Sequence, residues 1–457
     1  MAKLKFCGGV SGSVTGACYL IETATTKILV DCGMFQGSRF SEDLNSEPFP
    51  FDPKEIKAMV LTHAHIDHSG RIPKLYRDGF RGKVYGTSPT LDFAHTLLLD
   101  SEHVIKEEAK REGVEPFYNK VDVNNAAQLM EPKEYGEEVI VSDDIRFIMR
   151  NAGHILGSSI VQVFVKNEEG KEIKLVFSGD LGNYPAPILG STEFIDDADY
   201  LLVESAYGDR LHESVRERKD MLEDVIEETI KAGGTLMIPA FAAERTQELL
   251  FELNELVENG RIERVPIYLD SPLAIKITEI YKRHKEFYDK EAIQLLKTDK
   301  DIFDFPGLHF TPDVEQSKAI DRSSEPKIII AGSGMSNGGR IVHHEKHFLP
   351  DPKSTLLIIG FQVKGSLGRK LLEGEKEVHI LGQPVTVRAR IENIRGYSAH
   401  ADQKQLLDWI ANMRHTVKKV FVVQGDTEAS EALASVARDQ LAVDAETPEL
   451  GDEIELV

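Results

Sequence analysis

The feature that most constrains the fold of this chain is a change in its apolar pattern near residue 209. Up to about Glu204, short apolar runs recur, and most of them end in a polar or glycine-containing corner. After Asp209, helix-like segments alternate with strand-like segments such as GTLMIPAFA and PKIIIAGSG, as in a parallel α/β domain. The segment from residue 397 returns to a loop, a helix and a strand. Since no Pro/Gly/Ser-rich linker separates these parts, the pattern predicts one domain inserted into another.

Composition limits the class of protein. The 457 residues exceed one ordinary core and fit two domains, and 28 % charged with 41 % hydrophobic residues is typical of a soluble globular protein. No apolar run approaches the roughly 18 residues of a membrane helix, and the N-terminus lacks a signal-peptide core. The sequence therefore predicts a cytoplasmic protein with no membrane partner. Cys7, Cys18 and Cys32 are odd in number and show no CxxC spacing, which indicates neither a disulfide framework nor a cysteine zinc site.

The formal net charge of -22 restricts the ways in which this chain can bind nucleic acid. A polyanion is repelled by such a molecule at long range, so indiscriminate binding is disfavoured. A local basic channel remains compatible with the charge.

The stretch LTHAHIDHSG, residues 61–70, packs three histidines and an aspartate into six residues. It follows an apolar run that reads as a strand, and a helix is predicted to open near Ser69. His63 and His65 lie two apart in an extended chain and point to the same side, while Asp67 and His68 can turn back toward them. Imidazole and carboxylate groups together suit zinc or a similar divalent ion. The whole HxHxDH pattern therefore predicts a metal site.

Further polar side chains close other apolar runs. They are Asp31 after KILV, His154 after RFIMRNAG, Asp180 after KLVFSG and Glu204 after LLV. Singly, each carboxylate reads as a cap or turn residue. Together with HAHIDH, they predict a site at one edge of a rigid sheet.

On these residues the chain resembles the β-CASP family of metallo-β-lactamase-fold nucleases. The matching segments span nearly the whole chain in family order and include LVDCGMFQG, LTHAHIDHSGRIPKL, NAGHILGSS, FSGDLG, VESAYGDR, PAFAAERTQELL, AGSGMSNGGR and GYSAHAD. The resemblance implies an α/β fold, namely a metallo-β-lactamase αββα sandwich with an inserted parallel-sheet β-CASP domain. We expect the sandwich to comprise residues 1–208 and 397–457, and the inserted domain residues 209–396.

The resemblance also implies a role for each site residue. The ligands of the first zinc ion would be His63, His65 and His154; Asp67 and His68 would hold a second zinc, and Asp180 would bridge the two. Asp31 would orient the ligand loop, and Glu204 with His400 of GYSAHAD would protonate the leaving oxygen. Asp67 is also expected to take part in catalysis. Two metal ions about 3.5 to 4 Å apart can activate a hydroxide and neutralise the charge that develops on a phosphodiester.

Gln424 in VFVVQGD departs from the family pattern, which has a histidine completing the second metal site. An amide oxygen is a weaker zinc ligand than imidazole. We therefore expect fewer than two tightly bound zinc ions, and we expect Gln424→His to tighten the second site.

Candidate phosphate contacts come from basic residues and from a glycine-rich loop that follows a strand and can offer backbone N–H groups. They are Arg245, Ser333, Gly334, Arg340, Lys364 and Ser398, with Arg369 and Lys370 as further basic candidates. For each of the basic residues, the sequence is equally compatible with a solvent-exposed charge that has no binding role.

The leading hypothesis is a zinc-dependent ribonuclease, endonucleolytic in action, with RNA as partner and a homodimer left open. RNA would enter a cleft between the two domains. One alternative is a small-molecule hydrolase of the same superfamily that acts on a lactam or thioester. The inserted domain disfavours it because it would cover the metal site. A second alternative is a catalytically silent binding partner, which the survival of all but one ligand disfavours.

Overall fold

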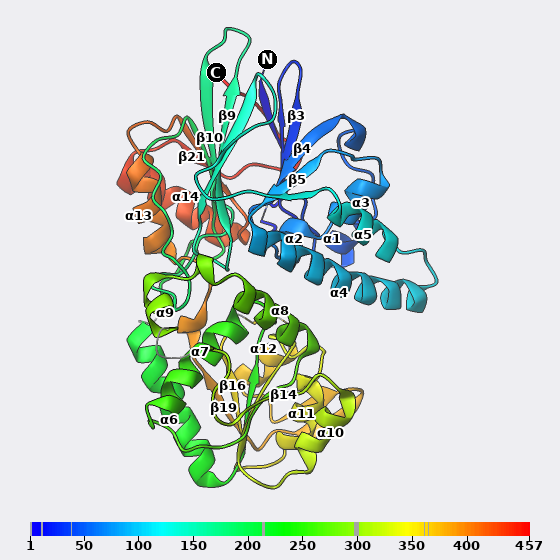
Figure 1. Ribbon diagram of the computed structural model, residues 1–457, viewed down its shortest axis with the longest axis vertical. Helices are drawn as coiled ribbons and strands as arrows, with labels where there is room; N and C mark the ends of the chain where they lie inside the picture. The colour runs from blue at the N-terminus through cyan, green and yellow to red at the C-terminus, as the bar shows by residue number, and fades with distance from the viewer. Residues whose placement is uncertain are drawn as a thin grey trace. The chain divides into compact units, whose positions relative to one another are not determined.

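The computed structural model describes residues 2–10, 12–37, 39–212, 215–296, 301–360, 362–363 and 365–457. The chain divides into two compact units (Figure 1). The first comprises Met1–Tyr184, Gly190–Leu211 and His400–Val457, and the second comprises Pro185–Leu189 and His212–Ala399. The domain boundaries drawn from the sequence, at 208 and 396, stay predictions.

Two seven-stranded sheets form the centre of the first unit within the described residues. The first sheet has the order β22-β1-β2-β3-β4-β5-β6 and the second β21-β20-β11-β10-β9-β8-β7. The strands of the first sheet are β1 (Lys3–Gly8), β2 (Cys18–Glu22), β3 (Lys27–Val30), β4 (Ile56–Val60), β5 (Lys83–Gly86), β6 (Met130–Pro132) and β22 (Glu453–Glu455). Those of the second are β7 (Glu138–Ile140), β8 (Ile145–Asn151), β9 (Ser159–Lys166), β10 (Glu172–Phe177), β11 (Tyr200–Glu204), β20 (Lys419–Val423) and β21 (Ala445–Glu446).

The two sheets share one hydrophobic core. Phe6 and Tyr19 of the first sheet pack in the same buried cluster as Phe147, Val163 and Phe421 of the second. Because successive residues of a strand point to opposite faces, the alternate apolar residues of these strands are left to pack against helices.

Helices cover the outer faces of the sheets. They are α1 (Arg39–Asp43), α2 (Ile66–Ser69), α3 (Ile72–Arg77), α4 (Ser88–Glu112), α5 (Lys120–Ala127), α13 (Gln403–Met413) and α14 (Thr427–Leu441). Trp409 of α13 and Leu433 of α14 share a buried cluster with Val422 of the second sheet. Leu98 of α4 and Val123 of α5 share another cluster beside the first sheet. This arrangement confirms the predicted αββα sandwich (Figure 1).

The long helix α4 shows how the local sequence sets its ends. Thr87 caps the N-terminus, where its side-chain oxygen accepts a hydrogen bond from the Thr90 N–H. Gly113 ends the helix at a φ of 72°, in the left-handed region that glycine adopts without a Cβ clash.

The second unit is built on a six-stranded sheet, within the described residues, whose neighbouring strands are all parallel, in the order β14-β13-β15-β12-β16-β19. Its strands are β12 (Thr235–Pro239), β13 (Ile267–Leu269), β14 (Leu308–Phe310), β15 (Lys327–Ala331), β16 (Thr355–Ile358) and β19 (Arg390–Asn393), and a separate hairpin comprises β17 (Glu377–Ile380) and β18 (Gln383–Thr386). Every residue of β12 and β15 is buried, as expected where helices cover both faces of a parallel sheet. This confirms the predicted inserted parallel-sheet domain.

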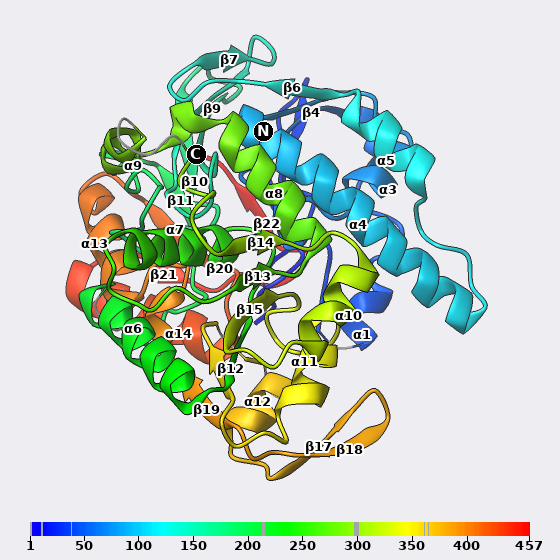
Figure 2. The same cartoon turned by 60° about the horizontal axis from the view of Figure 1, so that its bottom comes forward.

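Helices flank this sheet on both sides (Figure 2). They are α6 (Val215–Ala232), α7 (Arg245–Glu258), α8 (Pro272–Arg283), α9 (Lys290–Leu295), α10 (Val314–Arg322), α11 (Ile341–Phe348) and α12 (Leu367–Leu372). Ile320 of α10, Ile341 of α11 and Leu371 of α12 share one buried cluster with Met237 of β12. In Figure 2, α6 and α7 lie on the opposite side of the strands from α10 and α11.

The strands that carry the candidate ligands in the first unit end at a common edge of each sheet. In the first sheet, β3 and β4 run parallel. In the second, β10, β11 and β20 run parallel, and β8 has the same direction because both β8 and β10 are antiparallel to β9. Side chains just beyond the carboxyl ends of these strands can therefore converge.

Candidate metal centre

Four side chains that follow different strands meet in the first unit. His63 and His65 lie in the loop after β4, His154 in the loop after β8, and Asp180 in the loop after β10. Their donor atoms form a group in which every atom lies within 4.8 Å of the others. His63, His154 and Asp180 are buried at 0 %, 1 % and 4 % exposure. Such buried polar groups need a partner, and a cation suits a set of three imidazoles and a carboxylate.

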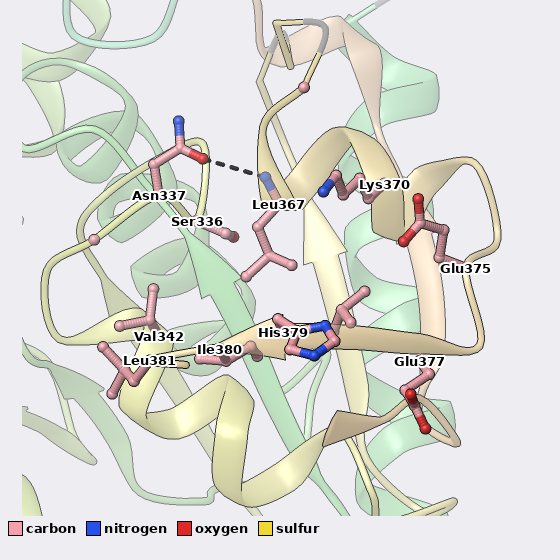
Figure 3. Close-up of a pocket in the computed structure, with 13 residues that line it drawn as sticks. Ser336, Asn337, Val342, Leu367, Lys370, Glu375, Glu377, His379, Ile380 and Leu381 are labelled. Carbon is pink, nitrogen blue, oxygen red and sulfur yellow. Dashed lines mark hydrogen bonds between the residues drawn. The ribbon is translucent and has the colours of Figure 1, made fainter. Parts of the chain in front are cut away.

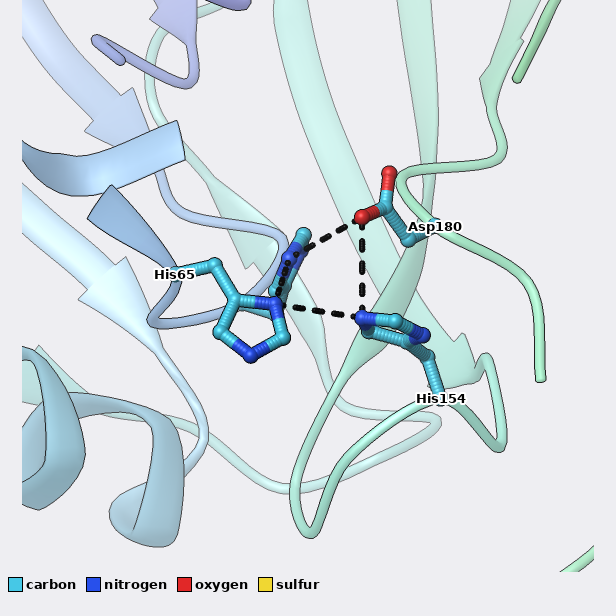
Figure 4. Close-up of side chains that lie close together, drawn as sticks. His65, His154 and Asp180 are labelled. Atoms are coloured by element: carbon cyan, nitrogen blue, oxygen red, sulfur yellow. Dashed lines mark hydrogen bonds and ion pairs between the residues drawn. The ribbon is translucent and has the colours of Figure 1, made fainter. Parts of the chain in front are cut away.

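The spacing of the four donor atoms fits a single tetrahedral ion (Figure 4). His65 Nδ1 lies 3.1 Å from His63 Nε2 and 3.2 Å from His154 Nε2. Asp180 Oδ2 lies 3.4 Å from His63 Nε2 and 3.5 Å from His154 Nε2. Zinc bonds of about 2.0 to 2.1 Å in a tetrahedron place neighbouring ligand atoms about 3.3 Å apart. The four measured separations scatter closely around that value.

The protonation states also suit metal binding. Burial holds the pKa values of His65 and His154 well below the usual range, so both imidazoles are neutral and have a lone pair to offer. Burial by itself raises the pKa of Asp180, but the charges on His68 and His63 outweigh it and hold that pKa well below its usual range. Asp180 is therefore an ionised carboxylate.

Asp31 fixes the loop that carries the histidines. Its Oδ1 accepts a hydrogen bond from the Thr62 N–H at 2.8 Å, and its Oδ2 accepts one from the Thr62 hydroxyl at 2.8 Å. The same Oδ2 lies 2.7 Å from His68 Nδ1. Asp31 follows β3 with a φ of 60°, an uncommon conformation for a residue with a side chain. These contacts suit the orienting role that the resemblance implies for Asp31.

Glu204 and His400 form a second group that shares Asp180. His400 Nδ1 lies 3.2 and 3.3 Å from the two oxygens of Glu204 and 3.9 Å from Asp180 Oδ2. Glu204 is fully buried, and its Oε1 accepts a hydrogen bond of 2.7 Å from the Leu181 N–H. Burial raises the pKa of Glu204, although the neighbouring His400 acts in the opposite direction. The distances between His400 Nδ1 and the two oxygens are those of a hydrogen bond between the imidazole and the carboxylate.

His400 also faces the first ligand set. Its ring centroid lies 4.7 Å from that of His154, while its side chain retains 26 % exposure. A proton at His400 is thus close to both the metal ligands and solvent.

The residues assigned to a second zinc ion lie beside the first cluster, and only one of the following distances matches its spacing. His68 Nε2 lies 3.3 Å from Asp180 Oδ1 and 3.9 Å from Asp67 Oδ2. Gln424 Nε2 lies 2.7 Å from His68 Nε2. Burial raises the pKa of Asp67. The two-zinc arrangement stays a prediction.

The proposed phosphate contacts lie in the second unit and make contacts of their own. Arg245 is 8 % exposed, and its Nη1 lies 2.5 Å from Glu244 and 3.6 Å from Glu248. Arg340 donates hydrogen bonds to Asp270 and to the carbonyl oxygens of Thr311 and Pro312. Both guanidinium groups therefore already have hydrogen-bond or ion-pair partners within the second unit.

The other members of that set are placed as follows. Ser333 Oγ accepts a hydrogen bond of 3.1 Å from the Asn337 N–H, and the Gly334 carbonyl accepts one of 2.9 Å from Gln362. Ser398 is 6 % exposed. Lys364 lies outside the described residues. The phosphate-binding roles of all these residues stay predictions.

Three residues near the centre were not identified from the sequence. Tyr19 of β2 donates a hydrogen bond of 3.3 Å to Gln424 Oε1. The Tyr207 ring centroid lies 6.1 Å from that of His400, and the Arg210 guanidinium lies 5.4 Å from the centroid of the Tyr207 ring. Tyr207 and Arg210 could have been found, because they stand in the motif VESAYGDR that contains Glu204. Tyr19 gave no signal, because it lies inside an ordinary apolar run.

A separate cavity of about 340 Å³ lies in the second unit, between the loop around Asn337, α12 and the β17–β18 hairpin (Figure 3). Lys370, Glu375, Glu377 and His379 are among the residues that line it. Asn337 Oδ1 accepts a hydrogen bond of 3.2 Å from the Leu367 N–H at its wall. Lys370 is also one of the basic residues that the sequence offered as a phosphate contact.

The fold and the metal centre define a metallo-hydrolase of the metallo-β-lactamase type, and comparison with known proteins agrees. Family models match residues 12–230 (metallo-β-lactamase superfamily), residues 246–371 (Beta-Casp domain) and residues 384–448 (Zn-dependent metallo-hydrolase RNA specificity domain). The chain belongs to the β-CASP ribonuclease family of metal-dependent hydrolases.

Similar proteins support this family. Ribonuclease TTHA0252 of Thermus thermophilus is 39 % identical over 94 % of this chain and 94 % of that protein. Transcription termination factors FttA of Methanosarcina mazei and Methanocaldococcus jannaschii are 31 % and 32 % identical, over 94 % and 95 % of this chain and 68 % and 69 % of their own length. A crystal structure of a protein of unknown function from Enterococcus faecalis V583 shares the fold, with a TM-score of 0.56, 11 % identity and 99 % coverage of both chains.

In the part of the chain that the structure describes, no helix is both long and apolar enough to cross a membrane.

Proposed function

We propose that this chain is a zinc-dependent endoribonuclease. The observation that carries the proposal is the set of four donor atoms of His63, His65, His154 and Asp180, whose spacing fits one tetrahedral zinc ion. A zinc ion held there would supply Lewis-acid chemistry, polarising a phosphodiester oxygen and lowering the pKa of a water molecule. The similarity to ribonuclease TTHA0252 of Thermus thermophilus and the match to the RNA specificity domain support RNA as the substrate class.

The protein's own groups would handle the protons. His400, supported by Glu204 at 3.2 Å, is placed to give a proton to the leaving oxygen. Asp67 has a pKa raised by burial and a side chain with 22 % exposure, so it can accept a proton from an attacking water. Donor and acceptor thus come from different loops of one unit.

Labelled RNA tests the endonucleolytic mode. A 5′-labelled and a 3′-labelled copy of one RNA, each with a 5′-monophosphate or a 5′-triphosphate, are incubated with the purified protein. An endonuclease cuts both copies at the same internal sites, with little dependence on the 5′ end. Release of labelled mononucleotides from the 5′-labelled copy would instead establish 5′-to-3′ exonuclease action. Faster hydrolysis of a lactam or a thioester than of RNA would favour the small-molecule alternative.

The salt dependence of binding tests contact with phosphates. We expect RNA affinity to fall as salt rises, because phosphate contacts release counterions, with about 0.7 lost from the log–log slope for each contact to a single strand. Arg210 is the candidate contact in the first unit, with 44 % side-chain exposure and an ion pair to Asp209. Arg210→Gln should remove one phosphate contact and so reduce the magnitude of the log–log slope by about 0.7.

Lys3→Gln is the matched control for that experiment. Lys3 is 47 % exposed, is also ion-paired, and begins β1 at the edge of the sheet opposite the metal centre. Its removal should leave the slope unchanged. Equal effects of both substitutions would indicate general electrostatics, and salt-independent affinity would contradict the substrate class.

A further inference from the structure

The carboxamide of Gln424 lies among the groups that were expected to bind a second metal ion. Gln424 directly follows β20 and is 4 % exposed. Its Nε2 lies 2.7 Å from His68 Nε2 and 3.2 Å from Asp180 Oδ1. These two contacts place the amide at the position that a cation shared by His68 and Asp180 would take.

The hydrogen-bond partners determine which atom of the amide faces this position. His68 Nδ1 lies 2.7 Å from Asp31 Oδ2, which can only accept, so Nδ1 carries a hydrogen; in the tautomer with that one ring hydrogen, Nε2 is an acceptor. Asp180 Oδ1 is an acceptor as well. The NH2 group has two hydrogens and can serve both. At the other end of the amide, Gln424 Oε1 accepts a hydrogen bond from the Tyr19 hydroxyl at 3.3 Å.

The surrounding backbone holds this side chain in place. The Gln424 N–H donates to the Gly9 carbonyl at 2.8 Å, and Gln424 has a φ of 55°. Gly9 has a φ of 70°, and a Cβ there would lie 3.0 Å from the Tyr19 hydroxyl and 3.3 Å from Gln424 Cγ. A glycine at this position therefore lets Tyr19 and Gln424 pack together.

The spacing around the amide differs from that of the first cluster. The 2.7 Å between His68 and Gln424 is a hydrogen-bond length, shorter than the roughly 3.3 Å that separates neighbouring ligands of a tetrahedral zinc ion. An ion would need to lie about 2.0 to 2.1 Å from His68 Nε2, along the lone pair that the amide already uses. Asp67 Oδ2 is 3.9 Å from the same nitrogen. His68 Nε2 does lie 3.3 Å from Asp180 Oδ1. With the amide nitrogen at 2.7 Å and Asp67 Oδ2 at 3.9 Å from the same nitrogen, however, the groups around His68 do not form the tetrahedral set that a second zinc ion needs.

We propose that the chain holds a single metal ion, and that the Gln424 amide, anchored by Tyr19, replaces a second one as a hydrogen-bond donor. The two oxygens of Asp180 then have different partners. Its Oδ2 faces His63 and His154 in the first cluster, while its Oδ1 is held by the amide. His68 becomes a positioning residue that links Asp31 to Gln424. This inference rests on the proposed metal centre of His63, His65, His154 and Asp180.

Metal content tests the inference directly. The natural protein, Gln424→His and Gln424→Glu are each dialysed against buffered zinc, and the bound metal is measured by elemental analysis per folded chain. We expect about one ion for the natural sequence and about two for Gln424→His, because imidazole is a strong zinc ligand. Gln424→Glu serves the same purpose if the histidine variant does not fold. Gln128→His is the matched control: it adds a histidine at an exposed helix end and should leave the content at one.

Each result has a distinct meaning. Two equally retained ions in the natural sequence would overturn the inference and leave the proposed function standing. One ion in both the natural protein and the folded Gln424 variants would also overturn it, since the amide would then not be taking the place of a metal. No bound ion in the natural protein would instead contradict the proposed metal centre.

Discussion

Asp180→Ala should abolish RNA cleavage while leaving the fold intact. Asp180 supplies the only carboxylate of the four-residue cluster among the described residues, and its two oxygens contact His63, His154, His68 and Gln424. Its loss removes a metal ligand and leaves a bound cation with no negatively charged ligand in this cluster. Lewis-acid stabilisation contributes several kcal/mol, and each 1.36 kcal/mol is a tenfold change in rate. We expect a loss of about 10³-fold or more in kcat/KM.

Metal content and circular dichroism accompany that rate measurement. Asp197→Ala is a suitable control, because Asp197 is 59 % exposed and its ion pair is with Lys174. The control should keep full activity and full metal content. An Asp180→Ala protein that cleaves RNA at the natural rate would refute the assignment of the site.

His400→Ala should lower kcat by about 10²-fold or more with little change in metal content, the usual scale for loss of a general acid. His400 Nδ1 contacts Glu204 at 3.2 Å, whereas His400 is absent from the four-residue group that fits the metal. The proton it provides is needed only when the leaving group is a poor one. A substrate whose leaving oxygen is replaced by sulfur needs no such proton, so it should be cleaved by His400→Ala at close to the natural rate.

The sulfur substrate separates a proton donor from a structural residue. If His400→Ala loses the same factor on the oxygen and sulfur substrates, His400 does not protonate the leaving group. If the variant loses its metal, His400 acts as a ligand, as the grouping of His400, Glu204 and Asp180 would also allow.

The sequence by itself determined the local parts of this protein. The apolar runs that end in polar corners correctly placed Asp31, His154, Asp180 and Glu204 at or just beyond strand ends. Those positions follow from periodicity, which is a property of neighbouring residues. The helix that was predicted to open near Ser69 begins earlier, at Ile66 inside the HAHIDH motif, with His65 at the N-cap position. The resemblance supplied the sandwich and the inserted parallel sheet, since its motifs span the chain in order.

Only the tertiary structure decided which distant side chains share a hydrogen bond. Tyr19 and Gln424 are 405 residues apart, and His68 and Gln424 are 356 apart. The sequence showed that Gln424 departs from the family pattern, and it suggested a weakened second metal site. It could not show that the amide nitrogen lies 2.7 Å from His68 Nε2 while the Tyr19 hydroxyl donates to the amide oxygen. Likewise, Arg245 reads as a free cation in the sequence, yet it lies buried against Glu244 and Glu248. Periodicity tells which face of its own element a side chain occupies, but its charge partner and its hydrogen-bonding atom depend on segments that only the packed fold brings within about 3 Å.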